Sequence, residues 1–180
     1  MELYLEELET PVGQVAIVTQ GSVVYALDFE DYRDRMDLLL NRYYGTHTLH
    51  AAPRESTAFA KLRAYFAGEL TAIESVEVAK PGTAFQQKVW AALREIPLGQ
   101  TQSYGELAAA IGQPKASRAV GMANGSNPIA IIVPCHRVIG SNAALTGYGG
   151  GMHRKEWLLQ HEGVVLKARK RRKTAEVAVA

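Results

Sequence analysis

The period of the hydrophobic pattern changes along this chain, and that change restricts the possible folds more than any other feature. Over residues 2–29 apolar residues alternate in three short runs, separated by turn residues at Pro11-Val12-Gly13 and Gln20-Gly21-Ser22. Alternation with period two is typical of strands that bury one face, so we expect a three-stranded meander. Beyond it the apolar spacing becomes helical. We therefore expect an α+β protein whose main sheet lies near the N-terminus.

Two helices and a short strand are expected to complete the N-terminal half. The spacing of apolar residues predicts helices over 32–44 and 56–67, each followed by a glycine. A short strand is expected over 75–79. Lys80-Pro81-Gly82 has the composition of a linker, and a second domain is expected to follow it.

The second half is expected to be mostly helical and to contain a helix-turn-helix. Thr83 and Gln86 form a capping box that begins one helix, and Ser103 and Glu106 form another. A third helix is expected over 116–123, joined to the second by a turn that contains glycine. This arrangement is typical of DNA-binding proteins, although many helix pairs that bind no DNA have the same pattern.

The helix expected over 116–123 has mostly small side chains, and Arg118 is its one long side chain. Small residues let a helix backbone approach another surface closely. That surface is either a neighbouring helix or the floor of a DNA groove that Arg118 enters. Composition does not decide between the two.

Charge is distributed unevenly along the chain. Residues 1–80 hold 7 Lys or Arg against 13 Asp or Glu, whereas residues 81–166 hold 7 against 4, and residues 167–180 add a basic run. We treat these ranges as an N-terminal domain, a C-terminal domain and a disordered tail. A polyanionic partner is expected to dock on the basic half. A solvated basic end with no partner is the alternative.

The chain lacks the sequence signals of a membrane or exported protein. No apolar run approaches the roughly 20 residues that cross a membrane. The first residues are acidic where an export signal would be basic. A single cysteine excludes an internal disulfide and a zinc site built from cysteines. We therefore expect a cytoplasmic protein that binds no membrane.

The lone cysteine, Cys135, follows an apolar run over 129–133 that we interpret as a buried strand. A cysteine in such a place is usually an inert small hydrophobe. Here Pro134 ends the expected strand, and His136 and Arg137 follow the thiol directly. Polar, electropositive surroundings favour the thiolate, which is the nucleophilic form, so we predict a reactive cysteine.

His136 is expected to act on Cys135 indirectly. Adjacent residues of an extended chain point in opposite directions, so contact between the two needs a bend or a bridging water. Glu162 is a candidate to orient His136, although it could equally be a surface acid at a helix end. Downstream, residues 147–151 form a glycine-rich segment with one aromatic ring, Tyr148. This segment is either a plain connector or the wall of a binding pocket.

Six segments of the C-terminal half together resemble one known family. They are Ile96–Ala108, Arg118–Gly121, Asn127-Pro128, Pro134–Val138, Gly147-Tyr148 and Lys155–Gly163. The family is that of the methylated-DNA–protein-cysteine methyltransferases, also called O6-alkylguanine-DNA alkyltransferases. The resemblance runs from about residue 85 to residue 163, and the Pro-Cys-His-Arg-Val sequence within it is highly specific.

The resemblance implies catalytic roles for five residues. Cys135 would accept the alkyl group, His136 would deprotonate it through a water, and Glu162 would orient His136. Tyr104 would bind the base and help to protonate the leaving guanine. Asn127 would hold the turn that precedes the reactive segment.

Further residues would contact DNA or the extruded base. Arg118 would fill the place that the flipped nucleotide leaves in the stack. The other residues implied at the DNA surface are Ser103, Ser117, Ala119 and Gly121. The residues implied in the base pocket are Val138, Tyr148, Gly149 and Gly150.

The activity implied is direct DNA repair. The alkyl group of O6-alkylguanine, and of O4-alkylthymine, would pass irreversibly to Cys135 after base flipping, once per molecule. The fold implied is a small ribonuclease-H-like α/β domain packed on a mostly helical, winged-helix-like domain. The partner would be double-stranded DNA bearing O6-alkylguanine. No cofactor and no obligate protein partner are implied, and we expect a monomer.

Three other classes of protein explain the sequence less well. A helix-turn-helix regulator leaves the Pro-Cys-His-Arg-Val sequence unexplained. Alkyltransferase-like sensors replace the cysteine that is present here. A cysteine hydrolase needs a histidine in direct reach of the thiol and an oxyanion site.

Two departures from the family affect what we expect of the pocket and of metal binding. Many relatives carry a larger residue where this chain has Gly149, so we expect a roomier pocket that tolerates O6-benzyl groups. Some relatives bind zinc through cysteines and histidines of the N-terminal domain. His47 and His50 alone make a poor site, and we expect no metal.

Overall fold

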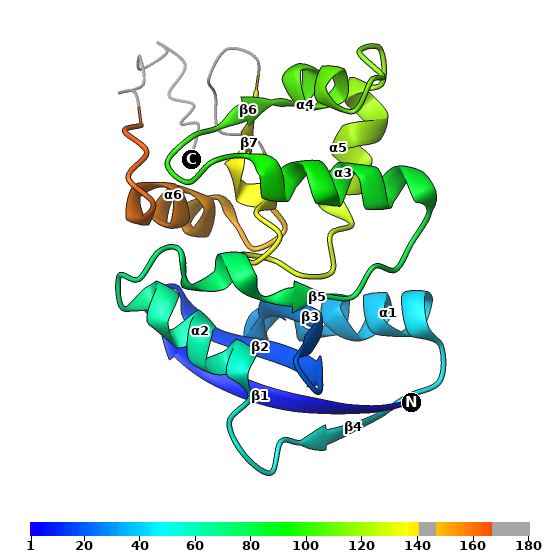
Figure 1. Ribbon diagram of the computed structural model, residues 1–180, viewed down its shortest axis with the longest axis vertical. Coiled ribbons are helices and arrows are strands. Elements are labelled where there is room, and N and C mark those ends of the chain that lie inside the picture. The colour runs from blue at the N-terminus through cyan, green and yellow to red at the C-terminus, as the bar shows by residue number, and fades with distance from the viewer. Residues whose placement is uncertain (141–146, 167–180) are drawn as a thin grey trace.

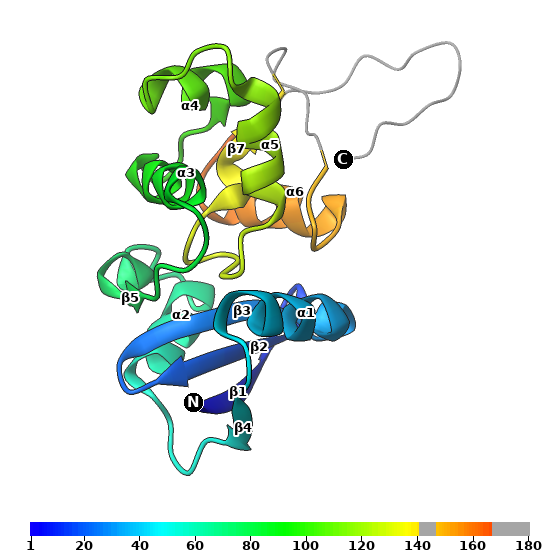
Figure 2. The same ribbon diagram turned by 90° about the vertical axis from the view of Figure 1, so that its right-hand side faces the viewer.

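The computed structural model describes residues 1–140 and 147–166 of the chain. A sheet with flanking helices forms the N-terminal half, and a group of helices lies on it and forms the C-terminal half (Figures 1 and 2). The α+β architecture expected from the sequence is confirmed. The expected disordered tail, residues 167–180, lies outside the described residues.

Five strands form the N-terminal sheet, in the order β4-β1-β2-β3-β5. The central three, β1 (Glu2–Thr10), β2 (Gly13–Gln20) and β3 (Val23–Phe29), are the expected antiparallel meander. The edge strands β4 (Thr48–Ala51) and β5 (Glu77–Val78) run parallel to their neighbours. We did not expect β4, because it is short, largely exposed and lacks an alternating pattern.

Alternation along β2 explains how the sheet is covered on both faces. Ala16 and Val18 belong to a small apolar cluster with Met36 and Leu40 of helix α1 (Arg33–Tyr44). The intervening residues of β2 belong to the main core, together with helix α2 (Thr57–Phe66) and the C-terminal half. A strand buried on both faces can therefore support two layers of helix.

The described part of the C-terminal half contains four α-helices: α3 (Ala84–Glu95), α4 (Tyr104–Ala110), α5 (Ser117–Gly125) and α6 (Met152–His161). Both predicted capping boxes are present, with Thr83 bonded to Gln86 and Ser103 bonded to Glu106. They satisfy backbone N–H groups that the first helical turn leaves unpaired. Two short parallel strands, β6 (Gln102–Ser103) and β7 (Val138–Ile139), join the first part of this half to the segment after Cys135.

Three short 3-10 helices complete the described chain: η1 (Glu30–Tyr32), η2 (Ala72–Ser75) and η3 (Cys135–Arg137). The strand predicted over 129–133 is wrong. That segment is a series of tight turns with a single bridge, from Ile129 to Leu27 of β3. All five of its residues are buried. A segment that is buried on all sides is uniformly apolar in any backbone conformation. Hydrophobicity alone therefore could not distinguish a turn from a strand here.

The two halves share one apolar core. Residues of the sheet, of α2, of α3 and of the 129–133 turns belong to the same buried cluster. Polar ties add to it: Arg154 of α6 donates from Nε to the carbonyl oxygen of Val12, at 2.9 Å, and from Nη1 to Asp31. The division at residue 80 stays a prediction. In the described part of the chain, no helix is long and apolar enough to cross a membrane.

Candidate active site

The side chain of Asn127 holds the turns that lead to Cys135. Its Oδ1 accepts from the backbone N–H of Ile129 at 3.0 Å, and its Nδ2 donates to the carbonyl oxygen of Val133 at 2.8 Å. Between these two bonds Ile131 has φ of 70°, a left-handed conformation that costs energy for a β-branched residue. Asn127 is itself 1% exposed, so its two bonds are protected from water. They therefore fix the path of the backbone into the reactive segment.

Cys135 is the first residue of η3 and is only 7% exposed. Burial raises the pKa of its thiol, and a hydrogen bond with Asn127 and the charges of Arg35 and Lys155 offset this only in part. The resting cysteine is therefore a protonated thiol. The expectation that neighbouring cations favour the thiolate is wrong for this state, because loss of hydration outweighs them.

His136 and Glu162 meet in the interior. Nε2 of His136 lies 2.8 Å from Oε2 of Glu162, and both side chains are fully buried. Arg137 donates from Nε to the other oxygen of Glu162, also at 2.8 Å. Tyr65 of α2 donates its hydroxyl to Oε2 at 2.6 Å. The possibility that Glu162 is a surface acid is excluded.

These contacts determine the charge of Glu162. Burial alone would raise the pKa of this carboxyl group, but the hydrogen bonds and charges of His136 and Arg137 lower it well below its usual value. A permanent carboxylate at Nε2 leaves the other ring nitrogen, Nδ1, as the one that can exchange a proton. Nδ1 is buried and has no hydrogen-bond partner among the described residues.

A small cavity of about 30 Å³ lies beside Cys135. Besides Cys135 itself, four of its lining residues are ones that the resemblance implied: Asn127, Tyr148, Gly149 and Gly150. Asn124 also lines it. The Oδ1 of Asn124 and the hydroxyl of Tyr148 are buried without a hydrogen-bond partner in the described part of the chain. Buried polar atoms of this kind mark places where a ligand or an ordered water belongs.

This cavity is far smaller than the purine pocket that the resemblance implied. Its volume is close to the share of one molecule in liquid water, about 30 Å³. Neither Val138 nor Tyr104 lines it. Val138 is fully buried in β7, next to the reactive segment. The site is thus closed in this structure.

Glycine is required at one of the two predicted pocket positions and is crowded at the other. A Cβ on Gly150 would overlap the ring of Phe29. A Cβ on Gly149 would lie 3.2 Å from the guanidinium carbon of Arg35. The space beside Gly149 is therefore bordered by Arg35, and the expectation of a roomier pocket than in relatives stays a prediction.

The residues predicted to contact DNA fall into two groups. Arg118 and Ala119 are exposed on α5, on the same side as Met122, which is 73% exposed. Ser117 is half-buried. A Cβ on Gly121 would instead lie 3.7 Å from the ring of Tyr104.

Gly121 therefore serves the packing of α5 against α4, which was one of the two alternatives for a helix of small residues. Ser103 is also engaged within the protein. Its hydroxyl accepts from the backbone N–H of Glu106 at 3.0 Å, and it is largely buried.

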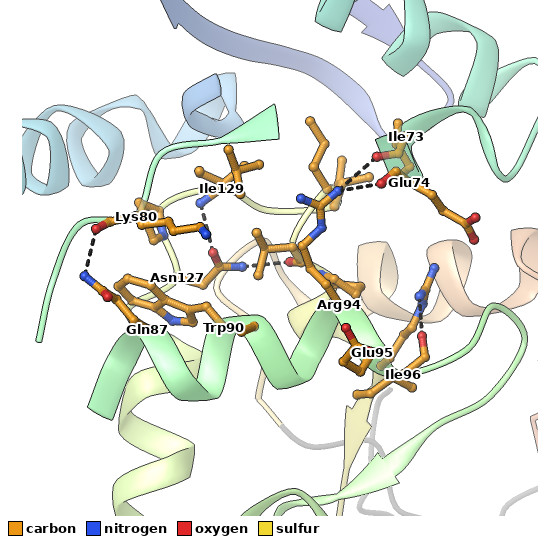
Figure 3. A pocket seen from close by; sticks show the side chains of 18 of the residues that line it. Ile73, Glu74, Lys80, Gln87, Trp90, Arg94, Glu95, Ile96, Asn127 and Ile129 are labelled. Atoms are coloured by element: carbon orange, nitrogen blue, oxygen red, sulfur yellow. Dashed lines mark hydrogen bonds between the residues drawn. The ribbon is translucent and has the colours of Figure 1, made fainter. Parts of the chain in front are cut away.

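A much larger cavity, of about 920 Å³, lies between η2, β5, α3 and the 129–133 turns (Figure 3). Trp90, Arg94 and Ile129 line it. At one end of the cavity, the guanidinium of Arg94 donates hydrogen bonds to the carbonyl oxygens of Ile73 and Glu74. Cys135 does not line it. This cavity borders the turns that carry the cysteine, so size alone would have located the wrong site.

Four residues at the site were not predicted from the sequence: Tyr65, Arg35, Asp28 and Asn124. The first three belong to the N-terminal half and reach the site only through the fold, so no local signal marks them. Asn124 had a signal: it is a polar residue on the side of α5 that carries the buried Val120 and Ala123. A polar side chain at a core position suggests a specific role.

Comparison with known proteins agrees with this geometry. A family model for the DNA-binding domain of 6-O-methylguanine DNA methyltransferase matches residues 84–164, and one for its ribonuclease-like domain matches residues 3–79. A methylated-DNA–protein-cysteine methyltransferase of Salmonella typhimurium is 50% identical over 169 residues, which cover 92% of this chain and 99% of the relative. One from Mycobacterium tuberculosis is 48% identical over 163 residues, which cover 89% of this chain and 92% of the relative.

Solved structures extend the similarity to three dimensions. The crystal structure of Mycobacterium tuberculosis OGT in complex with DNA has a TM-score of 0.72 and 45% identity, and covers 90% of this chain and 92% of that protein. The O6-methylguanine-DNA methyltransferase of Pyrococcus kodakaraensis has a TM-score of 0.67 and 25% identity, and covers 90% and 99%. The ribonuclease-like and DNA-binding architecture expected from the resemblance is thereby confirmed. This chain belongs to the 6-O-methylguanine DNA methyltransferase family.

Proposed function

We propose that this chain repairs DNA directly, by moving the alkyl group from O6 of guanine onto the sulfur of Cys135. It is a methylated-DNA–protein-cysteine methyltransferase in activity, and its partner is DNA that carries the lesion. The observation that carries the proposal is that His136, the residue directly after the cysteine, is paired in the interior with the buried carboxylate of Glu162. The cavity beside the same cysteine supports it, because Asn124 and Tyr148, which line it, carry buried polar atoms without a partner among the described residues.

The base must leave the duplex before it can react. An alkyl group on O6 lies inside the helix, so the nucleotide has to be extruded into the protein. The exposed side of α5 suits this step, because Ala119 allows close approach to a groove and Arg118 is long enough to fill the vacated place in the stack. Ser117 lies at the start of the same helix. Here Ser103 and Gly121 act by positioning α4 and α5.

Transfer is a displacement at the alkyl carbon. His136, through a water at Nδ1, takes the proton of Cys135, and Glu162 stabilises the histidinium that results. The bond between carbon and O6 breaks, a bond between carbon and sulfur forms, and guanine leaves with the electron pair. Tyr104 stabilises the leaving base. The permanent carboxylate of Glu162 is what makes a protonated His136 tolerable in the interior.

The closed cavity implies that the pocket opens when the base enters. Tyr148, Gly149 and Gly150 form one wall, and Val138 forms part of the adjoining backbone. Asn124 offers a free carbonyl oxygen to a donor on the base. The same pocket would accept O4-alkylthymine, whose alkyl oxygen is chemically similar.

Each molecule acts once. The product is a thioether, which lies outside the reversible oxidation states of cysteine and has no hydrolytic exit. A cytoplasmic location, where cysteines stay reduced, suits a protein whose function depends on one thiol.

A mass measurement tests the proposal. Incubation with a duplex that contains O6-methylguanine should add one methyl group per protein, mapped to the peptide with Cys135, and the Cys135→Ala variant should gain none. Binding without any mass gain would indicate a lesion sensor instead. Repeated turnover would indicate a hydrolase.

A further inference from the structure

A side chain of the N-terminal half closes the pocket at Cys135. Arg35 projects from α1 and lines the same 30 Å³ cavity as Cys135 and Tyr148. The guanidinium donates from Nη2 to the carbonyl oxygens of Gly125, at 2.8 Å, and Asn127, at 3.3 Å. It thus spans the gap between α1 and the turn that follows α5.

Asp28 anchors Arg35 from behind. Nη1 of Arg35 donates to Oδ2 of Asp28 at 2.8 Å, and the Asp28 side chain is 3% exposed. The other oxygen of Asp28 accepts from the backbone N–H of Phe29 at 2.9 Å. A guanidinium held by a buried carboxylate and two carbonyl oxygens has a fixed plane, unlike an arginine in solvent.

Arg35 lies directly against the place that the Cβ of a side chain at position 149 would take. Its guanidinium carbon lies 3.2 Å from the place of a Gly149 Cβ, and Nη1 lies 3.4 Å from it. Arg35, which comes from the N-terminal half, therefore narrows the pocket on the side where Gly149 has no side chain. Any group on the base that is bulkier than the cavity allows must displace the guanidinium or the backbone at Gly149.

We propose that Arg35, held by Asp28, determines the size of the O6 group that the pocket accepts. The inference rests on the function proposed above and adds a specificity-determining residue to it. A methyl group requires little displacement of the guanidinium. A benzyl group requires the guanidinium to leave its carbonyl partners, so Arg35 discriminates against it.

The test compares rates of transfer from two duplexes of identical sequence, one with O6-methylguanine and one with O6-benzylguanine. The main variant is Asp28→Asn combined with Arg35→Ala, which removes the guanidinium without leaving a buried carboxylate unpaired. It should raise the ratio of benzyl to methyl rate constants about tenfold, in the range of discrimination by pocket size. The matched control is Arg33→Gln, two residues earlier on α1, where Arg33 pairs with Glu30. Its ratio should equal that of the wild type.

A second pair of variants tests the contact itself. Gly149→Ala should slow both reactions in the wild-type background, because its Cβ crowds the guanidinium. In the Asp28→Asn/Arg35→Ala background it should slow them much less, since the crowded neighbour is gone.

The outcomes are distinct. An unchanged benzyl-to-methyl ratio, with both rates lowered equally, would show that Arg35 only joins the domains and would overturn the inference. Should the double variant fail to fold, Arg35→Lys decides, because it keeps a cation beside Asp28 but is too short to span both carbonyl oxygens. Its ratio should rise, and a constant ratio overturns the inference. Failure of the wild type to transfer even methyl would instead overturn the proposed function.

Discussion

At the scale of single residues, burial decides the state of Cys135 before DNA arrives. The thiol has lost its hydration, and the nearby positive charges of Arg35 and Lys155 only partly compensate. A protonated thiol is a poor nucleophile, which protects the protein against adventitious alkylation. In the proposed mechanism, activation then depends on the proton transfer to His136.

The raised pKa of Cys135 predicts a specific pH dependence. Reaction of the folded protein with iodoacetamide should rise with a midpoint at higher pH than that of the denatured chain, because only the thiolate reacts and burial raises the pKa of the Cys135 thiol. The denatured chain is the control and should follow the ordinary thiol midpoint near pH 8.5. Alkylation rates at each pH give both curves. Coincident midpoints would contradict the assignment.

Glu162 contributes to stability through the same network. Glu162→Gln leaves Arg137 without its carboxylate and should lower the free energy of unfolding by about 3 kcal/mol at neutral pH. The folded pKa of Glu162 lies below its usual value of 4.5, so its contribution is complete above that pH and is lost as the pH falls further. The difference between wild type and variant should therefore narrow in acid.

Denaturant unfolding at several pH values measures this difference. Glu156→Gln is a suitable control, since Glu156 lies on the same helix but is partly exposed. A difference that stays constant down to about pH 3 would show that Glu162 is not the titrating group.

At the scale of elements, α5 has two different sides. One carries Arg118, Ala119 and Met122 to the surface, and another packs Gly121 on the ring of Tyr104. The small residues of α5 thus serve two different purposes: Ala119 lies at the surface, whereas Gly121 packs against the ring of Tyr104. Sequence composition showed that close approach was needed but not to which surface.

Substitution of Gly121 separates packing from DNA contact. Gly121→Ala places its Cβ at an ordinary 3.7 Å from Tyr104 and should be tolerated. Gly121→Leu should displace that ring and lower the free energy of unfolding by about 1–3 kcal/mol. Denaturant unfolding without DNA measures both. Equal stability of the Leu variant and wild type would mean that Gly121 faces solvent.

The reactive segment shows the limit of pattern at this scale. Elsewhere in the chain, elements were predicted well where periodicity or a capping box defined them, as in the meander and at Thr83 and Ser103. The 129–133 run has no period, because all of its residues are buried. Its path is set instead by the bonds of Asn127 to Ile129 and Val133.

At the scale of the whole molecule, the N-terminal half is part of the site. Tyr65 shares Glu162 with His136, and Arg35 closes the cavity at Cys135. A continuous apolar core joins the halves. The acidic half therefore supports the chemistry that the basic half carries.

This shared core predicts cooperative unfolding. Calorimetry should show one transition whose van't Hoff and calorimetric enthalpies agree, because neither half can expose the shared core and stay folded. A fragment of residues 81–166 should not fold alone, since it would lack the partner of Glu162 on α2 and the Val12 carbonyl that binds Arg154. Two resolved transitions would show independent domains.

The sequence by itself was enough to predict the meander, the capped helices, the family and the reactive cysteine with its following histidine. Each of these follows from the order or spacing of residues within a short segment. Only the tertiary structure decided that Cys135 is a protonated thiol, that its pocket is closed, and that Arg35 and Tyr65 belong to the site. These properties depend on burial and on contacts between residues far apart in the chain, such as Tyr65 and Glu162, which are 97 positions apart. Hydration and long-range contact are properties of the packed chain, and no local pattern encodes them.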